Sequence, residues 1–269
     1  MKTKFLPMTI SYVWTLVFLS PFLWMVLTSF KSETAAYQFP PTIFFKPDFH
    51  HYLQFLTDHN FYHALVNSLV AAGGSVLVAL VLGIPAAFSI STKSVNKQQN
   101  ILFFLISTKM MPVVGIILSY YLLFKSLGLL DTRLALFFIY LTMALPMTIW
   151  LLNTYFRDLP QEVLEASKVD GASNLMMLFK VVIPMSIPGI VTAGLLSFVL
   201  NWNELFFALN ITYTHATTLA VLVASNVTTE GLFWARLSAL SVLVTIVPII
   251  AGLIVQRHIV KGFTMGALK

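Results

Sequence analysis

Residues 157–184 read RDLPQEVLEASKVDGASNLMMLFKVVIP and form a charged segment between two long apolar stretches. Asp158 and Gln161 have the spacing of a helix N-cap and its reciprocating partner, and Pro160 suits the first turn of a helix. Gly171 can adopt the left-handed backbone conformation that ends a helix. The sequence therefore predicts a short helix over residues 159–170, about 18 Å long at 1.5 Å per residue.

This predicted helix is too short and too polar to enter a bilayer, so we expect it to lie along the membrane surface. Ser173 can cap a second helix that continues into the next apolar stretch. The first helix either docks into a groove on a cytoplasmic partner or rests on lipid. Lipid-binding helices are usually rich in lysine, whereas this one carries Glu162 and Glu165 and only Lys168, which favours the partner. Its small and apolar residues fall near one stripe: Leu159, Val163, Ala166 and Val169.

The composition of the whole chain requires lipid as a solvent. Its 269 residues are 58% hydrophobic and 10% charged, with a mean hydropathy of +0.86, whereas a soluble domain carries roughly 25% charged residues. No cysteine is present, which excludes disulfides, thiolate zinc sites and a cysteine nucleophile. The net charge of +6 lacks the basic runs of a nucleic-acid-binding protein, and lysine in a membrane protein serves to retain loops in the cytoplasm.

Six apolar stretches are long enough to span a bilayer, which takes about 20 residues. With six spans both termini lie on one side, and placing that side in the cytoplasm puts ten Lys and Arg residues in inner segments against four in outer ones. This agrees with the positive-inside rule. We therefore predict an all-α membrane protein with six transmembrane helices and cytoplasmic termini. The predicted spans are residues 5–30, 64–92, 101–124, 134–156, 181–203 and 237–256.

These spans define three predicted regions. Residues 1–61 hold the first transmembrane helix and the first outer loop, residues 62–258 form a core of five helices with the cytoplasmic loop 157–184, and residues 259–269 are a cytoplasmic tail.

The charged loop resembles the EAA motif of permease subunits from ABC importers. That motif is Glu-Ala-Ala, three residues, Gly, nine residues, and an apolar ending that closes on Pro. Glu165-Ala166-Ser167, Gly171 and the closing Pro184 keep this spacing, with Ser in place of the third Ala. The resemblance implies a type I ABC importer permease fold. It also implies that the loop is a coupling helix docked into a separate ATPase, with the following contact residues: Glu162, Glu165, Ala166, Ser167, Gly171 and Pro184.

Other stretches narrow the resemblance to maltose-permease-like sugar importers: NSLVAAGGSVLVALVLGIPAAFSIS from Asn67, SFVLNWNELFFAL from Ser197 and VKGFTMGALK from Val260. The resemblance implies a bacterial cytoplasmic membrane, a second permease subunit, two ATP-binding subunits and an extracytoplasmic sugar-binding protein. The tail is similar to one that reaches between ATPase subunits, through Gly262, Gly266 and Lys269. The chain has no GxxxxGK[ST] loop, so ATP and Mg²⁺ are expected on the partner subunits and no cofactor on this chain. The segment VLVASNVTTEGLFWARLSA from Val221 is similar to permeases for sugar alcohols and extends the implied substrate class to polyols.

Several polar residues within the spans are candidates for the substrate pathway. Asn201, Trp202, Asn203 and Glu204 could bind sugar hydroxyls, or they could form an interfacial belt. Lys109 either faces a cavity or extends its stem to the cytoplasmic interface. Tyr120 and Tyr140 are further candidates, although tyrosines in membrane bundles more often serve packing.

Other functions find less support. His59 and His63 stand four residues apart, but no thiolate or carboxylate group accompanies them, so we predict no metal site. A stand-alone secondary transporter of a small polar solute is the main alternative, and it needs carboxylates or repeated broken helices for coupling. No carboxylate lies in the middle of a predicted span. The chain also lacks HExxH and GxSxG, so we predict no catalytic residues and no enzyme activity.

Overall fold

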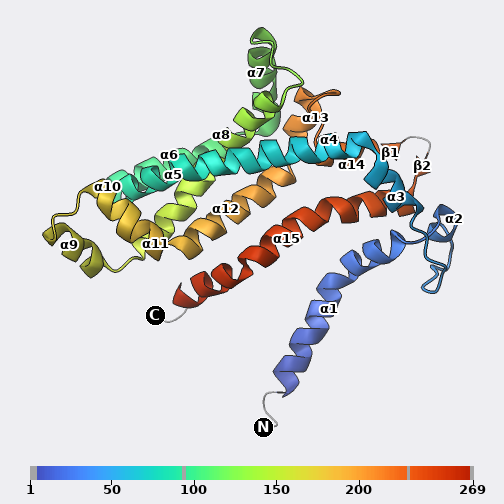
Figure 1. Cartoon of the computed structure of the whole chain (residues 1–269), viewed down its shortest axis with the longest axis horizontal. Coiled ribbons are helices and arrows are strands. Elements are labelled where there is room, and N and C mark those ends of the chain that lie inside the picture. Colours follow the sequence, from blue (N-terminus) through green and yellow to red (C-terminus); the bar gives the residue numbers. More distant parts are fainter. Residues whose placement is uncertain (1–4, 93–94, 229–230, 267–269) are drawn as a thin grey trace. The chain divides into compact units, whose positions relative to one another are not determined.

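The computed structural model describes residues 5–92, 95–228 and 231–266, and the chain is almost entirely helical (Figure 1). It divides into two compact units, each described by itself. One unit comprises Met1–Tyr62 and Leu222–Val247, and the other comprises His63–Val221 and Pro248–Lys269.

The second unit is built around α5 (Ser75–Ser91) and α8 (Arg133–Arg157), which pack along each other. Small residues on α5 allow the close approach, because a Cβ at Gly83 would lie 3.1 Å from the side chain of Thr148. Ala79 and Ala87 on the same helix are fully buried. Small residues are the usual means of packing helices in lipid, where apolar burial between helices adds little.

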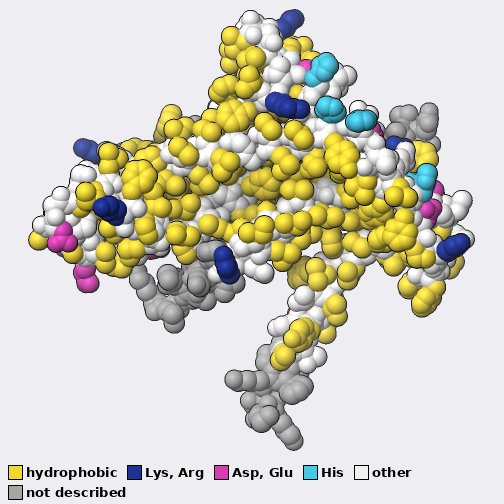
Figure 2. Space-filling model, viewed as in Figure 1, with side chains coloured by type: hydrophobic (Ala, Val, Ile, Leu, Met, Phe, Trp, Pro, Cys, Tyr) yellow, Lys and Arg dark blue, Asp and Glu magenta, His cyan; other side chains and the backbone are white. Residues whose placement is uncertain are grey.

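Two further helices complete this core. α6 (Val95–Lys109) and α12 (Ile187–Trp202) both pack against α8. The buried cluster at the α9 end of the unit includes Phe88, Leu152, Phe156, Met177 and Val182. Figure 2 shows hydrophobic side chains along the visible face of α5, and acidic side chains are among those visible at the α9 end.

Four of the predicted spans are long apolar helices: Met8–Thr28, His59–Ser91, Arg133–Arg157 and Trp234–Arg257. The second of them contains α4 (His59–Ser68), the π-helical turn η2 (Leu69–Gly74) and α5. These helices correspond to the predicted spans 5–30, 64–92, 134–156 and 237–256.

The other two predicted spans, 101–124 and 181–203, are each broken rather than continuous. α6 and α7 (Val113–Ser126) meet at an angle of 82°, so α7 turns away from α6 (Figure 1). Pro112 is the N-cap of α7 and has an extended backbone, and proline cannot donate the N–H that would continue a helix.

The second break, of 78°, lies at Ser186, between Pro184 and Pro188. It joins α12 to a segment made of α10 (Asn174–Met177), η3 (Leu178–Val182) and α11 (Ile183–Met185). The part of the chain that the structure describes therefore holds four continuous candidate spans, or up to six if each bent pair is one span.

The first unit contains α1 (Phe5–Thr28), α2 (Glu33–Ala36), α3 (His50–Thr57), and the antiparallel strands β1 (Val227–Thr228) and β2 (Gly231–Leu232). The carboxylate of Glu33 accepts backbone N–H groups from Ala235 and Arg236 at the start of α15 (Trp234–Gly266). A carboxylate at a helix N-terminus is favourable because it satisfies free N–H groups and opposes the helix dipole. His51 lies 3.5 Å from the same carboxylate.

A single carboxylate organises the loop that follows α13 (Phe206–Ile211) in the second unit. Asp131, just before α8, accepts backbone N–H groups from residues 213, 214, 215 and 216 at 2.9–3.2 Å, and also the hydroxyl of Thr214. Asn67 donates to the carbonyls of His215 and Thr217, while Arg133 donates to Asn67. This loop then leads to α14 (Leu219–Ser225). Burial of Asp131 raises the pKa of its carboxyl, but the four backbone N–H groups outweigh burial and hold that pKa well below its usual range.

We expect Asp131→Asn to lower the thermal stability of the purified protein by about 1–2 kcal/mol, because its amide presents N–H groups where the loop N–H groups need an acceptor. The folded pKa of Asp131 is depressed, so its contribution is complete above the unfolded pKa of about 3.9 and disappears as the pH falls through the folded value. The difference between the two proteins should therefore be constant from pH 5 to 8 and shrink below about pH 4.

Thermal unfolding in detergent measures this difference. Asp58→Asn is the matched control, because the carboxylate of Asp58 accepts a single backbone N–H among the described residues, from Asn60. Equal melting temperatures for Asp131→Asn and the unaltered protein would contradict the role of the Asp131 carboxylate in holding the loop that follows α13.

Candidate functional site: the coupling segment and a membrane cavity

The segment between α8 and α12 contains the predicted surface helix, α9, which spans Gln161–Val169. Its predicted start is wrong: Asp158 is the C-cap of α8, and Pro160 is the N-cap of α9 without a side-chain hydrogen bond. The N–H of Asp158 bonds the carbonyl of Tyr155, so Asp158 continues the end of α8 and is not free to begin α9. The helix consequently starts two residues later than the sequence predicts.

The end of α9 confirms the prediction for Gly171. Its φ is +80°, and its N–H bonds the carbonyl of Lys168 at 3.0 Å. The N–H of Ala172 bonds the carbonyl of Ser167, which completes the left-handed cap. The side chain of Ser173 accepts the N–H of Met176, so the second helix is capped as predicted.

α9 presents two different faces. Leu164 packs against the buried cluster, as does Leu159 just before the helix. The opposite face is exposed and carries Val163, Ala166 and Val169, the last of these 87% exposed. Leu159 therefore does not belong to the outward stripe. Apolar groups held out on a rigid short helix are suited to bind a complementary groove.

The remaining predicted contact residues differ in their exposure. Glu162, Glu165 and Pro184 are exposed, and Ser167 is half-buried, with its hydroxyl bonded to the carbonyl of Leu164.

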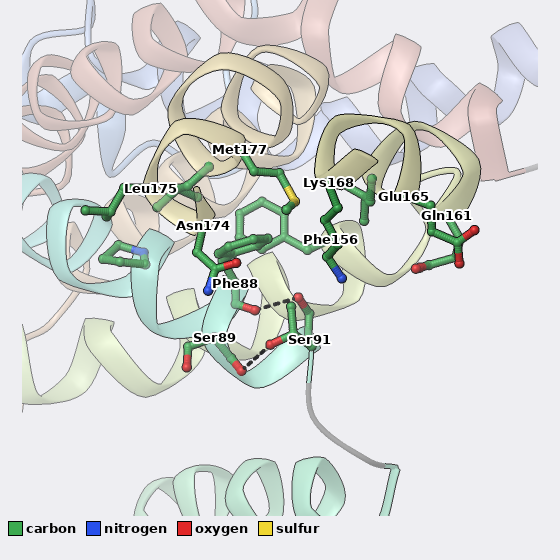
Figure 3. Close-up of a pocket in the computed structure, with 14 residues that line it drawn as sticks. Phe88, Ser89, Ser91, Phe156, Gln161, Glu165, Lys168, Asn174, Leu175 and Met177 are labelled. Carbon is green, nitrogen blue, oxygen red and sulfur yellow. Dashed lines mark hydrogen bonds between the residues drawn. The ribbon is translucent and has the colours of Figure 1, made fainter. Parts of the chain in front are cut away.

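A cleft of about 630 Å³ separates part of α9 from the end of α5 and from α10 (Figure 3). Gln161, Glu165 and Lys168 line it from α9, and Lys168 extends toward the end of α5 that carries Ser91. Asn174 lines it from α10. Leu164 is the residue of α9 that packs against the buried cluster, on the side of the helix away from its exposed face.

The candidate pathway residues at the end of α12 mostly bond to the protein itself. Asn201 is buried and donates to the hydroxyl of Ser75 and the carbonyl of Tyr140. Glu204 accepts the N–H groups of Phe207 and Ala208 and so caps α13, and the hydroxyl of Tyr140 donates to the backbone carbonyl of Glu204.

Trp202 and Asn203, the other two residues of this group, differ in their hydrogen bonds. The indole N–H of Trp202 is buried without a partner among the described residues, and Asn203 is exposed, with its amide bonded to the carbonyl of Val199.

Lys109 and Tyr120, by contrast, line one cavity of about 520 Å³ at the break between α6 and α7. The ammonium of Lys109 donates to the carbonyl of Met143 at 2.9 Å, and the hydroxyl of Tyr120 lies 3.0 Å from that of Thr142. Sequence reasoning missed Thr142 and Ser119 on this cavity because a helical wheel does not show where a broken span turns.

The other predictions fall on different parts of the chain. Gly262 and Gly266 belong to the backbone of α15, beyond the side chains that the structure describes, and Lys269 lies outside the described residues. Within the described ranges, no group of three or more His, Cys, Asp or Glu residues could hold a metal ion.

The helical fold, the exposed helix α9 and the cavity between α6 and α7 are typical of one class of protein, the multi-pass transport permeases. The chain matches the family described as "Binding-protein-dependent transport system inner membrane component" over residues 79–260 and belongs to it. Members of this family are transport permeases of the cell membrane rather than enzymes. The chain is thus an ABC transporter permease, and its predicted likeness to the maltose-permease-like group is confirmed.

Two relatives are similar to this chain along almost their whole length. The trehalose/maltose transport system permease protein MalG of Thermococcus litoralis is 32% identical and the match covers 94% of this chain and 92% of the relative. The trehalose transport system permease protein SugB of Mycobacterium tuberculosis is 31% identical, with 93% and 92% covered. A chain of a solved bacterial ABC transporter that imports the polysaccharide alginate has the same fold, with a TM-score of 0.75 and 22% identity over 94% of this chain and 95% of that one.

We expect Gly171→Val to reduce transport while leaving the amount of inserted protein unchanged. A Cβ at Gly171 meets no atom within 4 Å, so the cost comes from the left-handed backbone, about 1–2 kcal/mol for a residue with a side chain and more for a β-branched one. Gly171→Asn is the control, because asparagine tolerates this conformation. Uptake per inserted protein measures the effect, and equal uptake by the Val and Asn variants would contradict it.

Proposed function

We propose that this chain is one of the two permease subunits of an ATP-driven, binding-protein-dependent importer of a sugar or sugar alcohol. In this proposal the chain crosses the membrane six times with both termini in the cytoplasm, two separate ATP-binding subunits supply energy, and an extracytoplasmic protein delivers the substrate. Transport follows by alternating access of the permease pair.

The exposed face of α9 carries the proposal. Val163, Ala166 and Val169 point away from the buried cluster, although exposing apolar side chains on a polar loop gains nothing without a partner. The left-handed cap at Gly171 and the cap at Ser173 hold α9 at a set angle to α10, and η3 and α11 then connect it to α12. A partner that moves α9 would thereby move the membrane helices.

Relatives support the substrate class. Two are named as permeases for trehalose or maltose, and a third, the sulfoquinovosyl glycerol permease SmoH of Agrobacterium fabrum, is 31% identical over 93% of this chain. A second solved structure with the same fold is an alginate transporter in complex with a periplasmic protein that holds an alginate pentasaccharide. All of these substrates are carbohydrates or carry a sugar, and the last structure supports delivery by a binding protein.

Single cysteines test the topology directly, because the natural chain contains none. We expect a membrane-impermeant maleimide to label Ala166→Cys in inside-out vesicles from which the ATPase has been stripped, but not in intact cells. Lys46→Cys, an exposed site before α3, should show the reverse pattern. Labelling of Ala166→Cys from outside would reject the cytoplasmic docking surface.

A bulky residue on α9 tests coupling. We expect Ala166→Trp to lower uptake about tenfold or more and to reduce the amount of ATPase that co-purifies, because an indole cannot fit where a methyl group docks. Lys168→Ala, on the cleft side of the same helix, should retain both. Normal uptake by Ala166→Trp, or uptake by the purified chain without any ATPase, would overturn the proposal, and the latter would favour a secondary transporter.

A further inference from the structure

The break between α6 and α7 opens a cavity whose volume, about 520 Å³, lies within the range of small-molecule sites. The end of α6 contributes Thr108 and Lys109, and α7 contributes Ser119 and Tyr120. α8 closes another side through Thr142, Met143 and Pro146. Polar and apolar groups thus share one concave surface at a helix break, where a membrane protein can place irregular backbone next to a ligand path.

Lys109 supplies hydrogen-bond donors to this cavity. Its ammonium has three N–H donors, and its recorded hydrogen bond is the one to the carbonyl of Met143. No carboxylate lines the described cavity. A lysine in a membrane span is costly unless it faces water or a polar partner. Two N–H donors are therefore available to a molecule in the cavity.

The hydroxyl groups supply acceptors. Thr142 has one hydroxyl proton, and it is donated to the carbonyl of Ile139 at 2.7 Å. The contact of 3.0 Å between Tyr120 and Thr142 must then be a donation from Tyr120. This leaves lone pairs of the Tyr120 oxygen free to accept. The hydroxyl of Thr108 likewise donates to Leu105 and keeps its acceptor capacity.

A cavity with strong donors on one side and acceptors on the other fits a ligand that both accepts and donates hydrogen bonds. Hydroxyl groups do both, whereas a carboxylate or phosphate would leave the acceptors of Tyr120 and Thr108 without a donor. Phe207 adds an aromatic wall, edge-on to Tyr120 with ring centroids 5.6 Å apart. Such a wall can contact the C–H groups of a polyhydroxylated carbon chain or ring.

We propose that this cavity is a binding subsite for a sugar or an acyclic polyol. Lys109 selects the ligand by donating N–H groups to its hydroxyl oxygens, and the oxygen of Tyr120 accepts the O–H of a ligand hydroxyl. The inference rests on the proposed import function and names its substrate contact in this subunit. It also separates the candidates: Asn201, Tyr140 and Glu204 hold the helices together, while Lys109 and Tyr120 are available to the substrate.

Thiol protection tests the subsite in the full chain, within membranes that contain its co-purifying partners. Ser119→Cys places a single thiol on the cavity wall. We expect D-mannitol, D-glucose or maltose to slow its maleimide labelling in a saturable way.

Adding Lys109→Met should raise the sugar concentration that gives half protection about tenfold or more, because a charged hydrogen bond is lost, and Tyr120→Phe should raise it by less. Lys109→Arg, which retains donors, should stay within a few-fold.

The control is Lys125→Met, which removes an exposed lysine from the same helix as Tyr120 but outside the cavity; it should leave protection unchanged. Protection by none of the three compounds, or equal protection with and without Lys109, would overturn the subsite. Co-purification of an ATPase is scored in the same membranes, so that loss of the subsite and loss of the import function are distinguished.

Discussion

The structure depends on one constraint: a bilayer interior offers no water to satisfy backbone N–H and C=O groups. The chain meets this constraint with helices, and its irregular backbone is limited to a few places. Two of them are the breaks at Pro112 and Ser186, and each lies beside a feature to which we assign a function. The first borders the cavity of Lys109, and the second joins the segment of α9 to α12.

Packing explains how the broken helices are held. α5 and α8 approach closely at Gly83 and Thr148, and Asn201 ties the end of α12 to both, through Ser75 and the backbone of Tyr140. These bonds leave α7 and α9 as the elements of the second unit that project from this core (Figure 1). α7 carries Tyr120, one of the residues that we assign to a ligand, and Lys109 stands at the end of the neighbouring α6. α9 carries the residues that we assign to an energy-supplying partner.

The two assignments, a partner on α9 and a ligand beside Lys109, can be connected through the helices that lie between them. In the importer that we propose, force applied to the exposed face of α9 would reach α12 through a short capped segment, and α12 packs on α8. α8 also carries Thr142 and Met143, which border the cavity. A shift of α8 relative to α7 would change the contacts of Tyr120 and Lys109 at the same time, and the proposal would thereby link ATP hydrolysis to release of the substrate.

The amino-acid sequence by itself was enough to predict the class of protein, its apolar spans and the cap at Gly171. Hydropathy, charge bias and a left-handed glycine are local properties of the sequence. The sequence did not reveal the breaks, since an apolar window does not show whether a proline kinks a helix or turns it through about a right angle. Nor could it show that Asp131 binds a loop more than eighty residues away, or that Asn201 is consumed by packing while Lys109 faces a cavity. Those outcomes depend on which side chains meet across helices, and only the tertiary structure decides that.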